Sequence, residues 1–181
     1  MPLFQELTIA FSGRAEQKRL HEWQVSGAVH QLPGQLTYYG LYVNELIYHL
    51  SGRYDQNPLI YGLYSSSMHL LQHSVDALPV LRYFEKTLLE QLGYGLDWSM
   101  DIQGHKVSEG KGYQFYVGNG FAPATSDEAT IPGAVLLAIR QNNWSYDGAL
   151  LWAKRIFTKE IDRLLQGKVL KSRELFESAV K

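Results

Sequence analysis

The sequence predicts a mostly helical α+β fold, and three features of the 181-residue chain support this prediction. Apolar residues recur at helical spacing in several long segments of its middle and C-terminal parts. Two short segments near the N-terminus alternate apolar and polar residues, which is typical of a β-hairpin. Residues 94–131 are rich in glycine and have no helical period, so we expect an irregular lobe there.

The hairpin is predicted over residues 1–30, with strands at Leu3–Phe11 and Leu20–Val25. Ser12–Arg19, which contains Gly13, separates the two strands. The pair Pro33-Gly34 then predicts a turn. We expect a helical domain over residues 31–181 beyond it.

Three helices are expected next, over residues 36–50, 58–73 and 79–92. Asn57 suits the N-cap of the second helix, and Pro58 suits its first position, where a missing N–H is no loss. Gly93 suits the end of the third helix, because glycine readily adopts the left-handed conformation there.

In the lobe, we expect Trp98–Ile102 and Tyr113–Val117 to pair as short strands. Aromatic side chains should hold this lobe together: Trp98, Tyr113, Phe115, Tyr116 and Phe121.

After the lobe, we expect a helix that begins at Pro132 and ends at Arg140. We expect a longer helix next, capped by Ser145 and ending at Leu165. Ser172 is the expected cap of a last short helix.

Charge is distributed unevenly along the chain, although the net charge is only −1. From Ala134 to Lys181 there are nine Lys/Arg and five Asp/Glu, a net charge of +4; residues 1–133 hold eight and thirteen, a net charge of −5. A basic C-terminal end suggests a polyanionic partner.

The absence of cysteine excludes disulfides and thiolate metal sites. Without a signal peptide or an apolar stretch of about 18 residues, we expect a cytoplasmic protein that does not enter a membrane.

The basic residues of the helix ending at Leu165 share one face, because they are spaced by three or four positions. Cations in a row can follow a phosphate backbone, and an indole can stack on an unpaired base. The alternative is a solvated helix face with Trp152 half buried. The candidate nucleic-acid-binding residues are Trp152, Arg155, Lys159 and Arg163 on this face, Lys154 beside it, and Lys168, Lys171 and Arg173 beyond the helix.

Three sequence blocks, taken in order, identify a family: Gly40–Leu50 (GLYVNELIYHL), Leu81–Trp98 (LRYFEKTLLEQLGYGLDW) and Gly167–Phe176 (GKVLKSRELF). Together they resemble bacterial RecO, a family of DNA repair and recombination mediators that act on single-stranded DNA beside its binding protein SSB. The resemblance implies a helical RecO-type domain over residues 31–181. It also implies that residues 1–30 supply only the closing strands of an N-terminal OB-fold barrel.

The resemblance further implies the function and the partners. We expect the chain to bind single-stranded DNA and the C-terminal tail of SSB, to promote strand annealing and, with RecR, to help load RecA. A nucleoid-associated location follows from that role. In this family the RecR contact belongs to the barrel, of which only the closing strands are expected. The alternative function is a protein-interaction module that binds the SSB tail, or another acidic peptide, without contacting DNA.

The helix over residues 79–92 offers a site for that tail, which ends in an apolar aromatic residue and a free carboxylate, as the resemblance implies. An arginine can take a carboxylate in two hydrogen bonds while leucines hold the last ring. The candidate residues are Leu78, Arg82, Lys86 and Leu89, with Arg82 as the carboxylate ligand. The alternative is a modest surface ion pair between Arg82 and Glu85.

We find no motif for catalysis, a nucleotide or a cofactor, so the sequence predicts a binding factor and not an enzyme. His69 and His73 are four residues apart, but no third metal ligand lies near them. The four-cysteine zinc motif of some RecO-like chains is absent. Asn44 and Glu45, polar residues inside an apolar helix, are interpreted as ties to nearby backbone.

Overall fold

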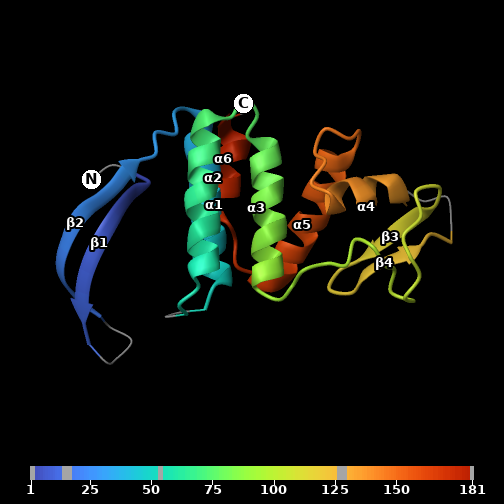
Figure 1. Ribbon diagram of the computed structural model, residues 1–181, viewed down its shortest axis with the longest axis horizontal. Helices are drawn as coiled ribbons and strands as arrows, with labels where there is room; N and C mark the ends of the chain where they lie inside the picture. Colours follow the sequence, from blue (N-terminus) through green and yellow to red (C-terminus); the bar gives the residue numbers. More distant parts are fainter. Residues whose placement is uncertain (1–2, 14–17, 53–54, 126–129, 180–181) are drawn as a thin grey trace.

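The structure is a computed structural model that describes residues 3–13, 18–52, 55–125 and 130–179. An N-terminal hairpin precedes three long helices, a small sheet and three further helices (Figure 1). The predicted mixed, mainly helical fold is therefore confirmed. No helix among the described residues is both long and apolar enough to cross a membrane.

The hairpin consists of strands β1 (Gln5–Ser12) and β2 (Arg19–Val29), which pair antiparallel. This confirms the two predicted strands, although β2 begins one residue earlier and ends four residues later than predicted. In the described residues no other strand joins this sheet, and the hairpin projects away from the helices (Figure 1). Its membership of an OB-fold barrel stays a prediction.

Helices α1 (Gln35–Leu50), α2 (Pro58–His73) and α3 (Leu78–Gln91) match the three predicted helices to within one residue. Local signals explain this accuracy. The Asn57 side chain accepts a hydrogen bond of 3.1 Å from the backbone N–H of Ile60, as an N-cap does. Gly93 follows α3 with a φ of +81°, a conformation that favours glycine.

The lobe holds a three-stranded sheet in which β3 (Gly112–Tyr116) lies between β4 (Gly120–Pro123) and β5 (Ile131–Pro132). The predicted pairing of β3 with residues 98–102 is wrong, because Met100 makes only an isolated bridge to Lys106. Strand β4 follows β3 after a short turn, so this pairing costs less loop-closure entropy. Of the five predicted aromatics, Trp98, Tyr113 and Phe121 are buried, Phe115 is partly buried and Tyr116 is exposed.

Helices α4 (Gly133–Arg140), α5 (Ala149–Leu165) and α6 (Lys171–Ala179) complete the chain. The predicted cap at Ser145 is wrong, because α5 begins only after Gly148, whose φ is +79°. The Ser145 hydroxyl instead donates to Asn143 Oδ1 at 2.8 Å.

The predicted cap of α6 at Ser172 is also wrong, since Ser172 lies inside the helix. The carboxylate of Glu45, on α1, satisfies the start of α6: it accepts the backbone N–H groups of Lys171 and Ser172, each at 2.9 Å. Partial burial raises the pKa of the Glu45 carboxyl, but the bonds from Ser172 and Lys171 outweigh it and the pKa lies below its ordinary value. Glu45 therefore bonds to backbone, as predicted. The backbone that it bonds, at Lys171, is not nearby in sequence but 126 residues further along the chain.

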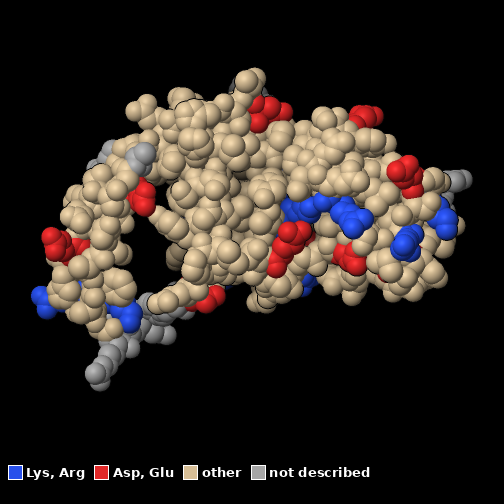
Figure 2. Space-filling view, viewed as in Figure 1, with Lys and Arg blue, Asp and Glu red and all other residues tan. Residues whose placement is uncertain are grey.

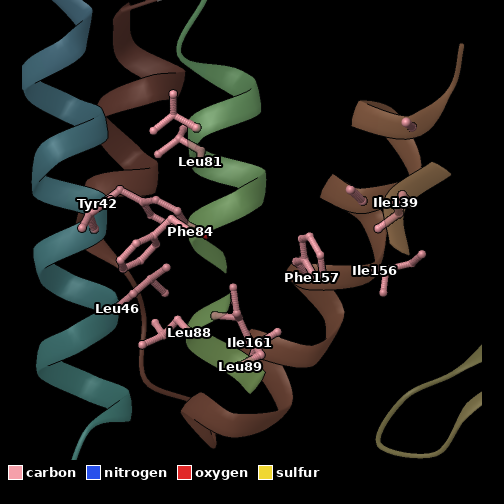
Figure 3. Close-up of a cluster of buried hydrophobic side chains, with 14 of the residues drawn as sticks. Tyr42, Leu46, Leu81, Phe84, Leu88, Leu89, Ile139, Ile156, Phe157 and Ile161 are labelled. Atoms are coloured by element: carbon pink, nitrogen blue, oxygen red, sulfur yellow. The ribbon is translucent and has the colours of Figure 1, made fainter. Parts of the chain in front are cut away.

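The hydrophobic core lies where α1, α3 and α5 meet (Figure 3). Leu46 of α1 faces Phe84 and Leu88 of α3, and Phe157 and Ile161 approach from α5 (Figure 3). Each of these side chains is almost inaccessible to solvent, and burying one contributes about 1.5–3 kcal/mol. This packing fixes which face of α3 and which face of α5 points outward.

Candidate nucleic-acid interface

Helix α5 turns one face into the core and the opposite face to solvent. Ala153, Ile156 and Phe157 are buried, whereas Lys154, Arg155 and Lys159 are exposed. The 3.6-residue period of the helix separates the two sets. Within the part of the chain that the structure describes, these three cations form no ion pair.

A groove of about 680 Å³ runs beside this exposed face, between α5 and the small sheet. Phe115 and Ile131 form the wall on the sheet side. The α5 side carries apolar, hydroxyl and basic side chains and no carboxylate; its residues are Leu151, Trp152, Lys154, Arg155, Ile156, Thr158 and Lys159. Sequence reasoning missed Phe115 and Ile131, because no local pattern brings a residue of the lobe to α5.

The Arg155 guanidinium lies over the Trp152 indole, with Cζ 4.9 Å from the ring centroid. Trp152 is partly buried against the core, as the alternative interpretation of this face supposed. A cation over an aromatic face is attracted by the negative charge of the ring face. The pair therefore places a positive charge and an aromatic ring side by side at the groove, and a nucleobase can stack on a guanidinium plane.

Arg163, the third cation of the predicted row, has a different role. Its Nη2 and Nε atoms contact Glu160 Oε2 at 2.9 and 3.0 Å, and its Cζ lies 5.8 Å from the Tyr94 ring centroid. Glu160 is fully buried and also accepts the backbone N–H of Gly118 at 2.5 Å. Arg163 thus compensates a buried carboxylate that sequence reasoning missed, although the spacing of three between Glu160 and Arg163 could have indicated the pair.

The basic residues beyond α5 fall into two groups, exposed lysines and an arginine held in an ion pair. Lys168 and Lys171 are exposed, near the C-terminal end of α5, and lie outside the set of residues that line the groove. Arg173 forms an ion pair with Asp162 of α5 and is about one-third exposed. The structure therefore brings four of the eight predicted residues to one groove: Trp152, Lys154, Arg155 and Lys159.

The predicted tail-binding face on α3 is not an open pocket. Arg82, Lys86 and Leu89 are each buried, and only Leu78 is exposed, at 43%. The Arg82 Nη2 atom contacts Glu85 Oε1 at 3.0 Å, and the same oxygen accepts the Tyr42 hydroxyl at 2.6 Å. The expected pair of Arg82 and Glu85 thus exists, but it is buried between helices instead of lying on the surface.

Lys86 is directed at the C-terminal end of α4. Its Nζ donates to the carbonyl oxygens of Ile139 and Arg140 at 3.2 and 2.9 Å and to Asn142 Oδ1 at 2.8 Å. An ammonium group compensates carbonyls that have no partner inside the helix. Burial lowers the pKa of Lys86. The prediction of an exposed cationic face on α3 is corrected, because both cations are held by internal acceptors.

The remaining charges leave one side of the molecule nearly neutral. Helices α1 and α2 contain no Lys or Arg, and Figure 2 shows few charged side chains over α1. Lys and Arg side chains appear instead over the half that carries α4 and the small sheet, and at the end of the hairpin (Figures 1 and 2).

The described residues contain no cluster of three metal-ligating side chains. The His69 and His73 rings contact each other, with their centroids 4.6 Å apart.

Comparison with known proteins defines the class of this fold. Residues 34–174 match the family model "Recombination protein O C terminal", which covers α1 to α5, the lobe and the start of α6. A basic groove on a domain of this class is consistent with the nucleic-acid partner that the sequence suggests.

Relatives extend the match to almost the whole chain. DNA repair protein RecO of Pseudomonas paraeruginosa is 36% identical over 174 residues, which is 96% of this chain and 75% of the relative. The RecO proteins of Pseudoalteromonas atlantica and Stutzerimonas stutzeri are 37% and 33% identical, also over 96% of this chain and over 73% and 74% of their own lengths. The chain therefore belongs to the RecO family of DNA repair proteins.

Proposed function

We propose that this protein is a recombination mediator that binds single-stranded DNA in the groove beside α5. The observation that carries the proposal is the stack of Arg155 on Trp152 beside the exposed cations Lys154 and Lys159. None of the described residues that line this groove is a carboxylate, so they offer no like charge to a phosphate backbone. Phosphate contacts and base stacking are the two elements of single-strand binding that does not depend on sequence.

The further steps rest on membership of the family. We propose that the protein anneals complementary strands, engages the SSB tail and, together with RecR, helps to load RecA. All of these are binding events, so we propose that it works without a cofactor and without catalysing a covalent step. Its location would be the cytoplasm, at the nucleoid.

The first test is the binding of a labelled single-stranded oligonucleotide to the full chain at several salt concentrations, measured by fluorescence anisotropy. Binding through phosphates releases condensed counterions, so the association constant should fall steeply as salt rises. Absent or salt-independent binding would overturn the proposal. It would favour the alternative function, a module that binds the SSB tail or another acidic peptide only.

The tail site on α3 stays a prediction, and the structure sets a condition for it. Arg82 is buried and already contacts Glu85, so a terminal carboxylate would have to reach it between the helices. Leu78 is the accessible member of the set, so Leu78→Ser is the suitable variant for a titration with an SSB-tail peptide. Weaker peptide binding by this variant would support the site on α3, whereas unchanged affinity would place the tail elsewhere.

A further inference from the structure

The two walls of the groove beside α5 differ in chemistry. On the α5 wall, Lys154, Arg155 and Lys159 are exposed and positively charged. On the sheet wall, Phe115 of β3 and Ile131 of β5 are apolar. Cations alone are enough to hold a polyanion. An apolar wall facing them therefore indicates a ligand that has an anionic side and an apolar side.

Phe115 is supported by a ladder of aromatic rings. Its centroid lies 5.6 Å from that of Phe121, which lies 5.2 Å from that of Trp98. Trp98 meets Phe157 of α5 edge to face at 5.7 Å. These separations are typical of favourable aromatic pairs. Phe121, Trp98 and Phe157 are buried, whereas Phe115 is partly buried and lines the groove. Packing thus restricts the Phe115 ring before any ligand binds, so a ligand that stacks on it loses less conformational entropy.

A hydrogen bond also ties the lobe to α5 close to this ring. The turn that follows β3 contains Gly118, whose backbone N–H donates to Glu160 Oε1 at 2.5 Å. Glu160 is fully buried on α5, and Arg163 holds its other carboxylate oxygen at 2.9 Å. Lys159, the residue before Glu160, lines the groove. The strand that carries Phe115 and the helix that carries the cations are therefore bonded to each other beside the groove, which keeps its two walls at a defined separation.

We propose that Phe115 is the residue through which this groove selects unpaired bases. A base of a single strand stacks on the Phe115 ring, while the phosphates of the same strand lie against Lys154 and Lys159. This inference rests on the proposed function, which is single-strand binding in the groove. Every base has a π-face, so stacking of this kind tolerates any sequence.

A duplex cannot use both walls in this way. Its base faces are covered by neighbouring base pairs, and its phosphates lie on the outside of the helix. The cations of α5 meet phosphates of either form, which is the salt-dependent part of binding. Phe115 adds a contact that only an unpaired, unstacked base can make. The α5 wall thus supplies affinity for any strand, and the sheet wall supplies the preference for a single strand.

The structure offers a matched pair of positions for a test. Successive side chains of a strand point to opposite faces of the sheet, so Tyr116 and Phe115 point to different faces of β3. Tyr116 is 46% exposed and is not among the residues that line the groove. Replacing either residue with leucine keeps an apolar side chain and removes one aromatic ring. Only the change at Phe115 removes a ring from the groove.

The test is a titration of the full chain with a labelled oligothymidylate and with a labelled duplex of the same length, at several salt concentrations. Phe115→Leu should weaken single-strand binding by about five- to a hundredfold, as loss of one base–aromatic stack does. Its affinity for the duplex and its salt dependence should match those of the unaltered protein. Tyr116→Leu should leave both affinities unchanged, and Phe115→Trp, which keeps a stacking surface, should keep the preference for a single strand.

Two results with these variants would overturn the inference. Unchanged single-strand binding by Phe115→Leu would show that bases do not stack on this ring. Equal weakening of single-strand and duplex binding would show that Phe115 only supports the shape of the groove. A different result, no single-strand binding by the unaltered protein, would overturn the proposed function itself, so the two failures can be told apart.

Photo-cross-linking of the unaltered protein keeps the inference testable if the Phe115 variants fold poorly. An oligonucleotide that carries iododeoxyuridine forms a covalent link to an adjacent aromatic ring on irradiation. Mass spectrometry of the digested complex should locate the adduct on the peptide that contains Phe115. Adducts confined to other residues would overturn the inference.

Discussion

Helices α3 and α5 carry cations in similar sequence patterns, yet the structure uses them in opposite ways. Arg82 and Lys86 of α3 are 7% exposed and contact Glu85 and the end of α4, whereas Arg155 and Lys159 of α5 are open at a groove. Spacing along a helix tells which residues share a face. It does not tell whether that face meets solvent or another helix with acceptors in position.

The largest contrast between the two helices should appear in stability. Arg82→Ala leaves the buried carboxylate of Glu85 without its cation, and breaking a buried pair costs about 3–5 kcal/mol. Arg155→Ala, on an exposed face, should change the free energy of unfolding by less than about 0.5 kcal/mol. Urea unfolding of both variants measures the difference. Equal effects of the two substitutions would show that Arg82 does not support the fold.

In oligonucleotide binding, the expected effect is smaller and comes from α5 instead of α3. Trp152→Ala removes the ring that supports the Arg155 guanidinium and should weaken single-strand binding by about 1–3 kcal/mol. The dependence on salt should stay the same, because no phosphate contact is lost. Binding isotherms at three salt concentrations report both quantities. A steeper or flatter salt dependence in this variant would mean that Trp152 acts by positioning cations and not by stacking.

The smallest expected effect concerns pH. Burial raises the pKa of the Glu85 carboxyl, although Arg82 acts in the opposite direction. The ordinary value applies in the unfolded chain, so the folded state retains the Glu85 proton to higher pH than the unfolded state does. This contribution to stability is full below the unfolded pKa and is lost as pH rises through the folded pKa. Glu85→Gln should remove that decline, which unfolding free energies measured across the acidic range will show; an unchanged pH profile would contradict the raised pKa.

Features determined by local sequence could be predicted. The bounds of α1, α2 and α3 depend on the turn at Pro33-Gly34, on the Asn57 cap and on Gly93, each adjacent to the helix that it limits. The two strands of the hairpin were likewise evident from alternation. The cation face of α5 was predicted for the same reason, since helical period alone separates Arg155 from the buried Ile156.

Features determined by distant contacts could not be predicted. The start of α6 depends on the carboxylate of Glu45, more than a hundred residues away, so the nearby Ser172 was the wrong choice. The groove depends on Phe115 and Ile131, which tertiary packing brings to α5. Burial of Arg82 and Lys86 likewise depends on Tyr42 and on the end of α4, neither of which is visible from the pattern of α3.

The central claim is that the free cations of α5 contact phosphate, and the salt dependence of single-strand binding tests it most directly. Neutralising Lys154, Arg155 and Lys159 together to Gln should flatten the slope of log affinity against log salt by about two units, since each phosphate contact contributes about 0.7. The control neutralises three exposed cations elsewhere, Arg19, Lys106 and Lys111, to Gln. The account predicts that the control keeps the slope of the unaltered protein. A triple α5 variant with an unchanged slope would contradict it.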